Sequence, residues 1–129
     1  MKANFGFMGL GVMGHMLALN VERNGFHVAG YDLDEKKVAA FEQKYPEKNL
    51  LACSTLEEFL AALERPRRIM LMVPSGVTDA AINSIKDLLE PGDLLIDGGN
   101  TFFQDTERRS KELEDKGIVY IGTGVSGGE

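Results

Sequence analysis

The chain has 129 residues, 43% of them hydrophobic and 26% charged, which is enough for one folded domain over residues 1–129 and excludes disordered and collagen-like classes. The formal net charge of −6 argues against general binding to nucleic acid or to an anionic membrane surface, because both require a basic face. The single cysteine excludes a disulfide framework within the chain, and no apolar run approaches the roughly 18 residues of a membrane span. We therefore expect a cytoplasmic protein with neither a nucleic-acid partner nor a membrane partner.

Short apolar runs alternate with longer amphipathic stretches along the chain. In chain order, the first half predicts a strand over 4–8, a helix over 12–24, a strand over 27–31, a helix over 35–45, a strand over 50–53 and a helix ending near 63. The second half predicts a strand over 68–73, a helix over 77–89, a strand over 93–97, a helix over 101–116 and a strand over 118–121. Helix ends are indicated by a cap at Asp34, capping boxes in Ser54–Glu58, and glycines at 25 and 117.

Strands that alternate with helices indicate βαβ units and a parallel sheet, and right-handed crossovers make such a sheet doubly wound. The predicted fold class is therefore α/β, a doubly wound parallel sheet in three αβα layers. The chain closes on the glycine-rich segment 122–129, which has the composition of a connection. We expect the chain to be a fragment of a longer protein.

One motif carries chemistry, the G-x-G-x-x-G of Gly9-Leu10-Gly11-Val12-Met13-Gly14. It follows a predicted strand and opens a predicted helix, and Asp32 ends the next strand, which is the context of the Rossmann dinucleotide fingerprint. Gly9 permits the tight turn, Gly11 lets the backbone approach a pyrophosphate, and Gly14 lets helix and strand pack closely. The free N–H groups and the dipole of the helix start favour that anion. A tight turn without ligand is the alternative.

Asp32 bears on which dinucleotide binds. Its carboxylate can accept hydrogen bonds from both adenosine ribose hydroxyls of NAD, whereas a 2′-phosphate would place like charges about 4 Å apart. That repulsion costs on the order of 1–4 kcal/mol, or roughly ten- to a thousand-fold in affinity. Asp34 adds to it, and Lys36 and Lys37 nearby could soften it. We predict NAD, with NADP as the alternative cofactor and a turn or helix-entry role as the alternative for Asp32.

The fingerprint together with Leu17-Ala18-Leu19-Asn20 resembles the β-hydroxyacid dehydrogenase family. Later segments resemble the 6-phosphogluconate dehydrogenases within it: RRIMLMV at 67–73, DGGNTFF at 97–103, Asp105-Thr106 with Arg108-Arg109, and GTGVSGGE at 122–129. The sister 3-hydroxyisobutyrate dehydrogenases typically have a serine-threonine pair where this chain has Gly99-Asn100. The resemblance covers the whole chain.

The resemblance implies oxidative decarboxylation of 6-phosphogluconate to ribulose 5-phosphate, with hydride transfer to the nicotinamide. It implies that Asn100 and Ser126-Gly127-Gly128 contact the substrate beside the nicotinamide, where Asn100 also meets the cofactor. It places Met13, Val73 and Pro74 on the nicotinamide side of the cleft. An amide that donates and accepts suits a polyhydroxy acid, and glycines let backbone N–H groups reach a carboxylate. A turn asparagine and a bare loop are the alternatives.

Two departures from the family pattern concern the cofactor and the substrate side. NADP-using members carry Asn-Arg-Ser or Asn-Arg-Thr where this chain has Asp32-Leu33-Asp34, which favours NAD. The common Val-Lys-Ala after the fourth strand is Val73-Pro74-Ser75 here, so that a donor and a charge are lost.

The resemblance places the catalytic lysine and glutamate in a helical domain beyond residue 129, so we expect this chain to bind cofactor and to be inactive alone. It also implies a homodimer formed through that domain, and hence a monomeric fragment. The alternatives are the NADP-dependent enzyme, a related 3-hydroxyacid dehydrogenase, and an NAD-sensing module without catalysis.

The remaining polar side chains receive structural interpretations. No metal-ligand spacing is recognised among the Asp, Glu, His and Cys positions. We expect His15 at the surface of the first helix, His27 at a strand entrance and Cys53 in the core. Arg108 and Arg109 are expected on a solvated outer helix face.

Overall fold

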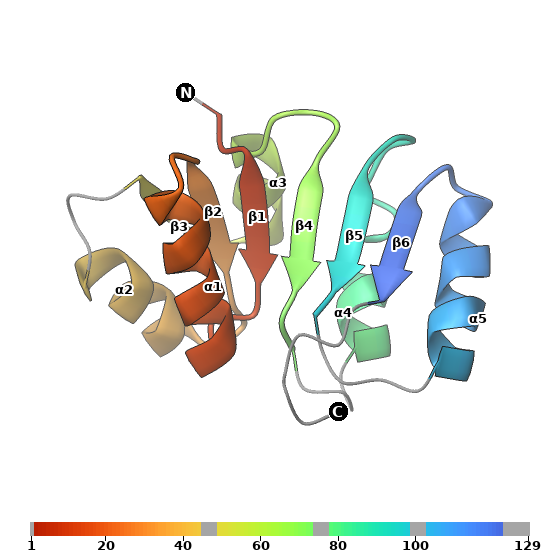
Figure 1. Ribbon diagram of the computed structural model, residues 1–129, viewed down its shortest axis with the longest axis horizontal. Coiled ribbons are helices and arrows are strands. Elements are labelled where there is room, and N and C mark those ends of the chain that lie inside the picture. The colour runs from red at the N-terminus through yellow and green to blue at the C-terminus, as the bar shows by residue number, and fades with distance from the viewer. Residues whose placement is uncertain (1, 45–48, 74–77, 99–102, 123–129) are drawn as a thin grey trace.

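The computed structural model describes residues 2–44, 49–73, 78–98 and 103–122. These residues form six strands and five helices in strict alternation (Figure 1). The elements are β1 (Phe5–Met8), α1 (Val12–Arg23), β2 (Val28–Tyr31), α2 (Glu35–Lys44), β3 (Leu50–Cys53), α3 (Leu56–Ala62), β4 (Arg68–Leu71), α4 (Thr78–Ile85), β5 (Leu94–Asp97), α5 (Phe103–Glu114) and β6 (Val119–Gly122).

The strands form a single parallel sheet in the order β3-β2-β1-β4-β5-β6. The chain moves from β1 outward to β3, returns across the sheet to β4 beside β1, and moves outward again to β6. The strand order therefore reverses between β1 and β4, which is the place where doubly wound sheets bind their ligands. The predicted doubly wound α/β fold is confirmed.

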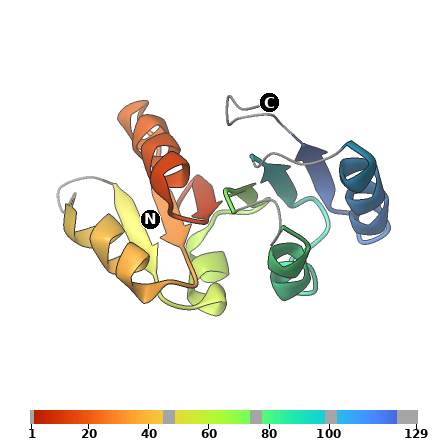
Figure 2. The same ribbon diagram turned by 90° about the horizontal axis from the view of Figure 1, so that it is seen from below.

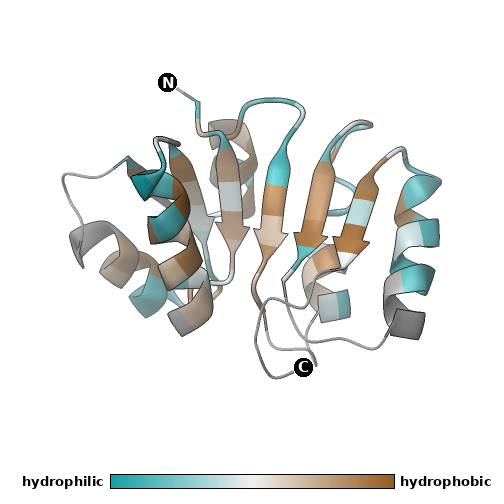
Figure 3. Cartoon of the chain, in the orientation of Figure 1, coloured by the Kyte–Doolittle hydropathy of each residue, from teal (hydrophilic) through white to brown (hydrophobic). Residues whose placement is uncertain are grey.

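Alternate residues of the strands face two separate cores, because successive side chains point to opposite faces of a sheet. One core joins α1 and α2 to β1 and β2 through residues such as Phe7, Ala18, Val28 and Phe41. The other core packs helices α3, α4 and α5 on the opposite face. Figure 3 shows hydrophobic residues along the strands and hydrophilic ones on the outer surface of α5.

Local signals set the helix ends. Thr55 caps α3 by accepting a hydrogen bond from the Glu58 N–H at 3.1 Å, and the Glu58 carboxylate accepts one from the Ser54 N–H at 2.9 Å. The Asp34 carboxylate accepts from the Lys36 N–H at 3.0 Å and so opens α2. Gly25 has a φ of +97° just after α1, the left-handed conformation of a helix C-terminus. The ends predicted at Asp34 and Gly25 are therefore confirmed, and of the two overlapping capping boxes predicted in Ser54–Glu58 the structure shows the contacts of Thr55 with Glu58.

Three predicted elements extend too far toward the carboxyl terminus, and one of them, α5, ends at Glu114 rather than at 116. Helix α4 ends at Ile85, although the periodic pattern predicts helix to residue 89. Leu89 is nevertheless buried, because its N–H and that of Leu88 still bond to the Ile85 carbonyl in the turn that follows. Strand β4 ends at Leu71 rather than at 73, and only the Met72 N–H, which donates to the Met8 carbonyl, extends the pairing.

The two faces of the sheet are not covered equally. Within the described part of the chain, no helix lies over β4, β5 and β6 on the α1 side (Figure 2). Val119 and Ile121 are exposed there, in register with Leu94 and Ile96 of β5. Among the same residues, no helix is both long enough and apolar enough to cross a membrane.

Candidate dinucleotide site

The turn from β1 into α1 is built on two glycines that allow no side chain. Gly9 has a φ of +106°, and a Cβ on it would lie 2.4 Å from the Met72 carbonyl oxygen. A Cβ on Gly14 would lie 2.2 Å from the Gly9 carbonyl oxygen. Because both obstacles are backbone atoms, the first turn of α1 can pack against the ends of β1 and β4 only with glycine at these positions.

Gly11 has different surroundings. It is the N-cap of α1, with φ −69° and ψ −170°, a backbone conformation open to any residue. A Cβ on Gly11 would meet nothing within 4 Å, so packing within the described structure does not require glycine here. The N-cap has no side chain to accept from the first-turn N–H groups, and the first turn carries no acidic residue. The start of α1 is therefore an open surface with positive dipole character, which suits an anion.

Asp32 lies beside this turn and is bound to it. Its Oδ2 accepts a hydrogen bond from the Leu10 N–H at 2.7 Å, and its Oδ1 accepts one from the Asp34 N–H at 2.8 Å. The predicted alternative of a turn residue is thus part of its role. An ionised carboxylate has about four lone-pair sites, so each oxygen keeps capacity to accept from a further donor such as a ribose hydroxyl.

Leu33 is a residue that the sequence interpretation missed. It follows Asp32 and is 87% exposed, which leaves an apolar side chain free on the loop after β2. The available signal was one apolar residue between two aspartates at the carboxyl end of a strand.

The chain after the ends of β4 and β5 lies beside the dinucleotide turn. Met13 is exposed at the start of α1, and Val73 is half-buried just beyond β4. A Cβ on Gly98 would lie 2.4 Å from the Met72 Sδ, so the chain after β5 packs closely on the residue after β4. Pro74, Asn100, Ser126, Gly127 and Gly128 lie outside the described residues, so their predicted roles are untested. The roles of Gly9, Leu10, Gly11, Val12, Met13, Gly14, Asp32 and Val73 in binding likewise stay predictions.

The predicted solvated position of Arg109 is wrong. Its side chain is only 4% exposed, because α5 lays it across the carboxyl ends of β5 and β6. Arg109 Nε donates to Asp79 Oδ1 at 2.8 Å, and Nη1 lies 3.7 Å from Asp97 Oδ2. Tyr120 donates its hydroxyl hydrogen to the same Asp97 oxygen at 2.6 Å. Helix periodicity could not reveal this contact, because the partners come from three other elements.

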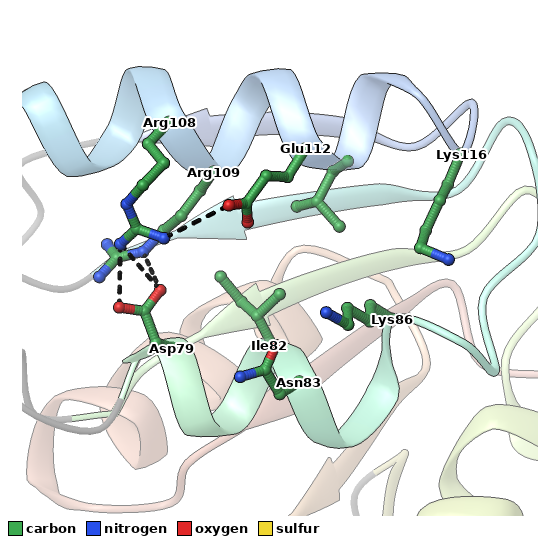
Figure 4. A pocket seen from close by; sticks show the side chains of 9 residues that line it. Asp79, Ile82, Asn83, Lys86, Arg108, Arg109, Glu112 and Lys116 are labelled. Atoms are coloured by element: carbon green, nitrogen blue, oxygen red, sulfur yellow. Dashed lines mark hydrogen bonds and ion pairs between the residues drawn. The ribbon is translucent and has the colours of Figure 1, made fainter.

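Arg108 remains half-exposed and donates to Asp79 from the solvent side, with Nη2 3.0 Å from Oδ2 (Figure 4). The two guanidinium groups lower the pKa of Asp79 to about 2, with the Arg109 hydrogen bond as the main cause. Burial raises the pKa of Tyr120, and the hydrogen bond to Asp97 adds to that effect. Asp79, Arg108 and Arg109 border a groove of about 420 Å³ between α4 and α5, and none of residues 9–14 lines this groove.

The other titratable side chains play structural parts. Cys53 is fully buried as predicted, and burial raises the pKa of its thiol to about 12. His27 directly precedes β2 as predicted, with its N–H bonded to Asn4 Oδ1. His15 is half-buried rather than at the surface, with its ring edge-on to Phe41 of α2 at 5.5 Å. No group of three metal-ligating side chains is assembled within the ranges that the structure describes.

The chain is similar to proteins of one family over almost its whole length. It is 57% identical over 129 residues to the decarboxylating 6-phosphogluconate dehydrogenase of Lactococcus lactis, covering 99% of this chain and 27% of that protein. It is 51% identical over 129 residues to the NADP(+)-dependent decarboxylating enzyme of Bacillus subtilis, covering 99% of this chain and 28% of that protein. The chain therefore spans about a quarter of the length of these curated relatives.

Solved structures agree with these sequence relatives. The Plasmodium falciparum 6-phosphogluconate dehydrogenase superposes with a TM-score of 0.84 at 32% identity, over 91% of this chain and 26% of that one. That enzyme was solved in complex with its cofactor NADP+ and in complex with its substrate 6-phosphogluconate. A Mycobacterium tuberculosis 3-hydroxyisobutyrate dehydrogenase, with a TM-score of 0.77 at 19% identity over 95% of this chain and 40% of that one, shares the fold.

The family description "NAD binding domain of 6-phosphogluconate dehydrogenase" matches residues 4–129. Together with the glycine turn, the acidic residue after β2 and the strand order, this match shows that the chain belongs to the family of 6-phosphogluconate dehydrogenase NAD-binding domains.

Proposed function

We propose that the chain binds a nicotinamide dinucleotide across the ends of β1 and β4, as the cofactor domain of an enzyme that oxidatively decarboxylates 6-phosphogluconate. The observation that carries the proposal is the contrast among the three glycines of the turn. Gly9 and Gly14 are required by packing, whereas Gly11 faces open space at the start of α1. A residue without a side chain there is explained by a ligand that approaches the backbone.

Each part of the turn has a task in this proposal. The N–H groups at the start of α1 hold the pyrophosphate, and Asp32 accepts from the adenosine ribose. Leu33 offers an apolar surface to the adenine, while Met13, Val73, Pro74 and Asn100 border the nicotinamide. Held by these residues, the dinucleotide would supply the hydride acceptor for oxidation of the substrate. Asn100 and residues 126–128 orient the substrate, and the proton-transferring lysine and glutamate belong to the region beyond residue 129, so this chain alone is inactive.

We further propose that NAD is preferred. Both oxygens of Asp32 are held by backbone N–H groups, so the carboxylate cannot easily swing away from an incoming 2′-phosphate. Against this, the Bacillus subtilis relative is named as NADP(+)-dependent, and the Plasmodium falciparum structure contains NADP+. Repulsion of about 1–4 kcal/mol would separate the two cofactors by roughly ten- to a thousand-fold.

A calorimetric titration of the 129-residue chain with NADH and with NADPH at one ionic strength tests both proposals. Tighter binding of NADH supports the preference, and tighter binding of NADPH overturns it while keeping the dinucleotide site. Absence of binding to either would refute the site in this chain. We also propose that the chain is monomeric and that the protein is cytoplasmic. Light scattering during the same titration tests the first proposal, and cell fractionation tests the second.

A further inference from the structure

Beside the carboxyl end of β5 lies a polar cluster, in which the side chains of Asp97, Tyr120 and Arg109 are buried and those of Asp79 and Arg108 are about half-exposed. Asp97 is the last residue of β5 and is 1% exposed. We propose that this cluster positions Gly98 against Met72 beside the dinucleotide turn, with Asp97 as a positioning residue for dinucleotide binding. This inference rests on the proposed function.

Two neighbouring elements, β6 and α5, hold the side chain of Asp97. The Tyr120 hydroxyl of β6 donates to Asp97 Oδ2 at 2.6 Å, and Arg109 Nη1 of α5 lies 3.7 Å from the same oxygen. Arg109 is fixed in turn by Asp79 of α4, whose Oδ1 accepts from Nε at 2.8 Å. Three elements thus converge on the end of one strand.

Gly98 and Met72 connect Asp97 with the dinucleotide turn. Gly98, the next residue, donates its N–H to the Leu71 carbonyl at 2.9 Å and packs against Met72. Met72 is also the residue whose backbone closes over Gly9 and whose Cβ would lie 3.2 Å from a Cβ on Gly14. A shift of Asp97 is therefore passed through Gly98 and Met72 to the two packed glycines of the turn.

The charged groups of the cluster balance one another. Two arginines, Arg108 and Arg109, face two aspartates, Asp79 and Asp97, so the cluster is neutral as a whole. Leu95, two residues earlier on the same face of β5, packs in the hydrophobic core, whereas Asp97 places a carboxylate there. Apolar packing has little directional preference, whereas a hydrogen bond fixes both the distance and the direction between two particular atoms. The polar cluster therefore fits a positioning role better than a purely stabilising one.

The test compares Tyr120→Phe, which removes one hydroxyl, with the control Ile85→Val, which trims a buried side chain at the far end of α4. Amide hydrogen exchange is measured at Gly98 and, as a reference outside the proposed path, at Val28, whose N–H donates to the Asn49 carbonyl between β2 and β3. NADH affinity is measured by fluorescence for the same proteins. Urea unfolding checks that both variants are folded and lose similar stability.

In Tyr120→Phe, we expect Gly98 exchange to rise about tenfold relative to Val28 and the NADH dissociation constant to rise several-fold, since a hydrogen bond to a charged group is lost. Ile85→Val should leave both ratios unchanged. Arg109→Met, if folded, should repeat the pattern more strongly.

The proposal is overturned if Gly98 and Val28 are affected equally, or if the control weakens NADH binding as much as Tyr120→Phe does. If the unmodified chain does not bind NADH, the proposed function fails instead. The exchange ratio then still decides whether the cluster positions Gly98.

Discussion

Replacing Gly11 with alanine separates binding from folding at the dinucleotide turn. The backbone of Gly11 suits alanine, and the added Cβ meets no atom within 4 Å. Removing a glycine from the unfolded chain stabilises by about 0.4–1 kcal/mol, whereas alanine is a poorer N-cap than glycine by a similar amount. The free energy of unfolding should therefore change by less than about 1 kcal/mol.

The affinity of Gly11→Ala for the dinucleotide should fall by much more than its stability does. The methyl group projects into the space that we assign to the pyrophosphate and holds it away from the N–H groups of α1. Losing one hydrogen bond to a charged group costs about 1.5–3 kcal/mol, which is roughly a 10- to 150-fold rise in the dissociation constant for NADH.

Gly14→Ala is the matched control, with the same added methyl group three residues further on. Its Cβ would lie 2.2 Å from the Gly9 carbonyl oxygen and 3.2 Å from the Met72 Cβ, so α1 must move away from the sheet. Overpacking of this kind costs about 1–3 kcal/mol or more, and we expect a lower midpoint of urea unfolding.

The assay combines NADH fluorescence titration with urea unfolding for the unmodified chain and both variants. The reasoning is refuted if Gly11→Ala binds NADH as tightly as the unmodified chain. It is equally refuted if Gly11→Ala loses as much stability as Gly14→Ala, because Gly11 would then be a packing residue.

Three further outcomes follow from individual side chains. Asp32→Asn should weaken the binding of NADH and remove about 1–4 kcal/mol of repulsion from the binding of NADPH. If calorimetry shows an unchanged ratio of the two affinities, Asp32 only supports the turn. The pKa of about 12 predicts that Cys53 is inert to a thiol reagent at pH 8 until urea unfolds the chain, and rapid labelling of the folded chain would contradict its burial. The pKa of Asp79 lies near 2, below the usual 3.8, so its stabilising contribution is present above about pH 4 and lost as the pH falls through 2. Because Asp79 is 52% exposed, solvent screening reduces this contribution to about 1 kcal/mol, and urea unfolding at pH 7 and pH 2.5 should show a smaller acid loss in Asp79→Asn than in the unmodified chain.

Local signals in the sequence were enough to predict most of the fold. Glycine after a helix, a threonine three residues before a glutamate, and the alternation of apolar runs all act through neighbouring backbone groups. Gly25, Thr55 and Glu58 behave as these rules require. The excess length predicted for α4 has the same origin, since Leu88 and Leu89 continue the helical spacing although the chain has already turned.

The dinucleotide turn was predictable for the same reason, because its three glycines form a motif of six consecutive residues that directly follows a strand. The family resemblance extended that prediction to a reaction. Neither could distinguish the glycines required by packing from the glycine left open, because the obstacle at Gly9 is the carbonyl of Met72, which is 63 residues away in the sequence.

The burial and the partners of polar side chains that contact distant parts of the sequence were determined only by the tertiary structure. A helix pattern shows which residues share a face, but not which charges from other elements meet that face. Arg109 became buried because Asp79, Asp97 and Tyr120 surround it from α4, β5 and β6. Asp32 became part of the turn because the register of β1 with β2 brings its carboxylate to the Leu10 N–H. The sequence by itself determined the strand–helix alternation and the chemistry of the turn, whereas the packing of distant elements determined what holds that turn in place.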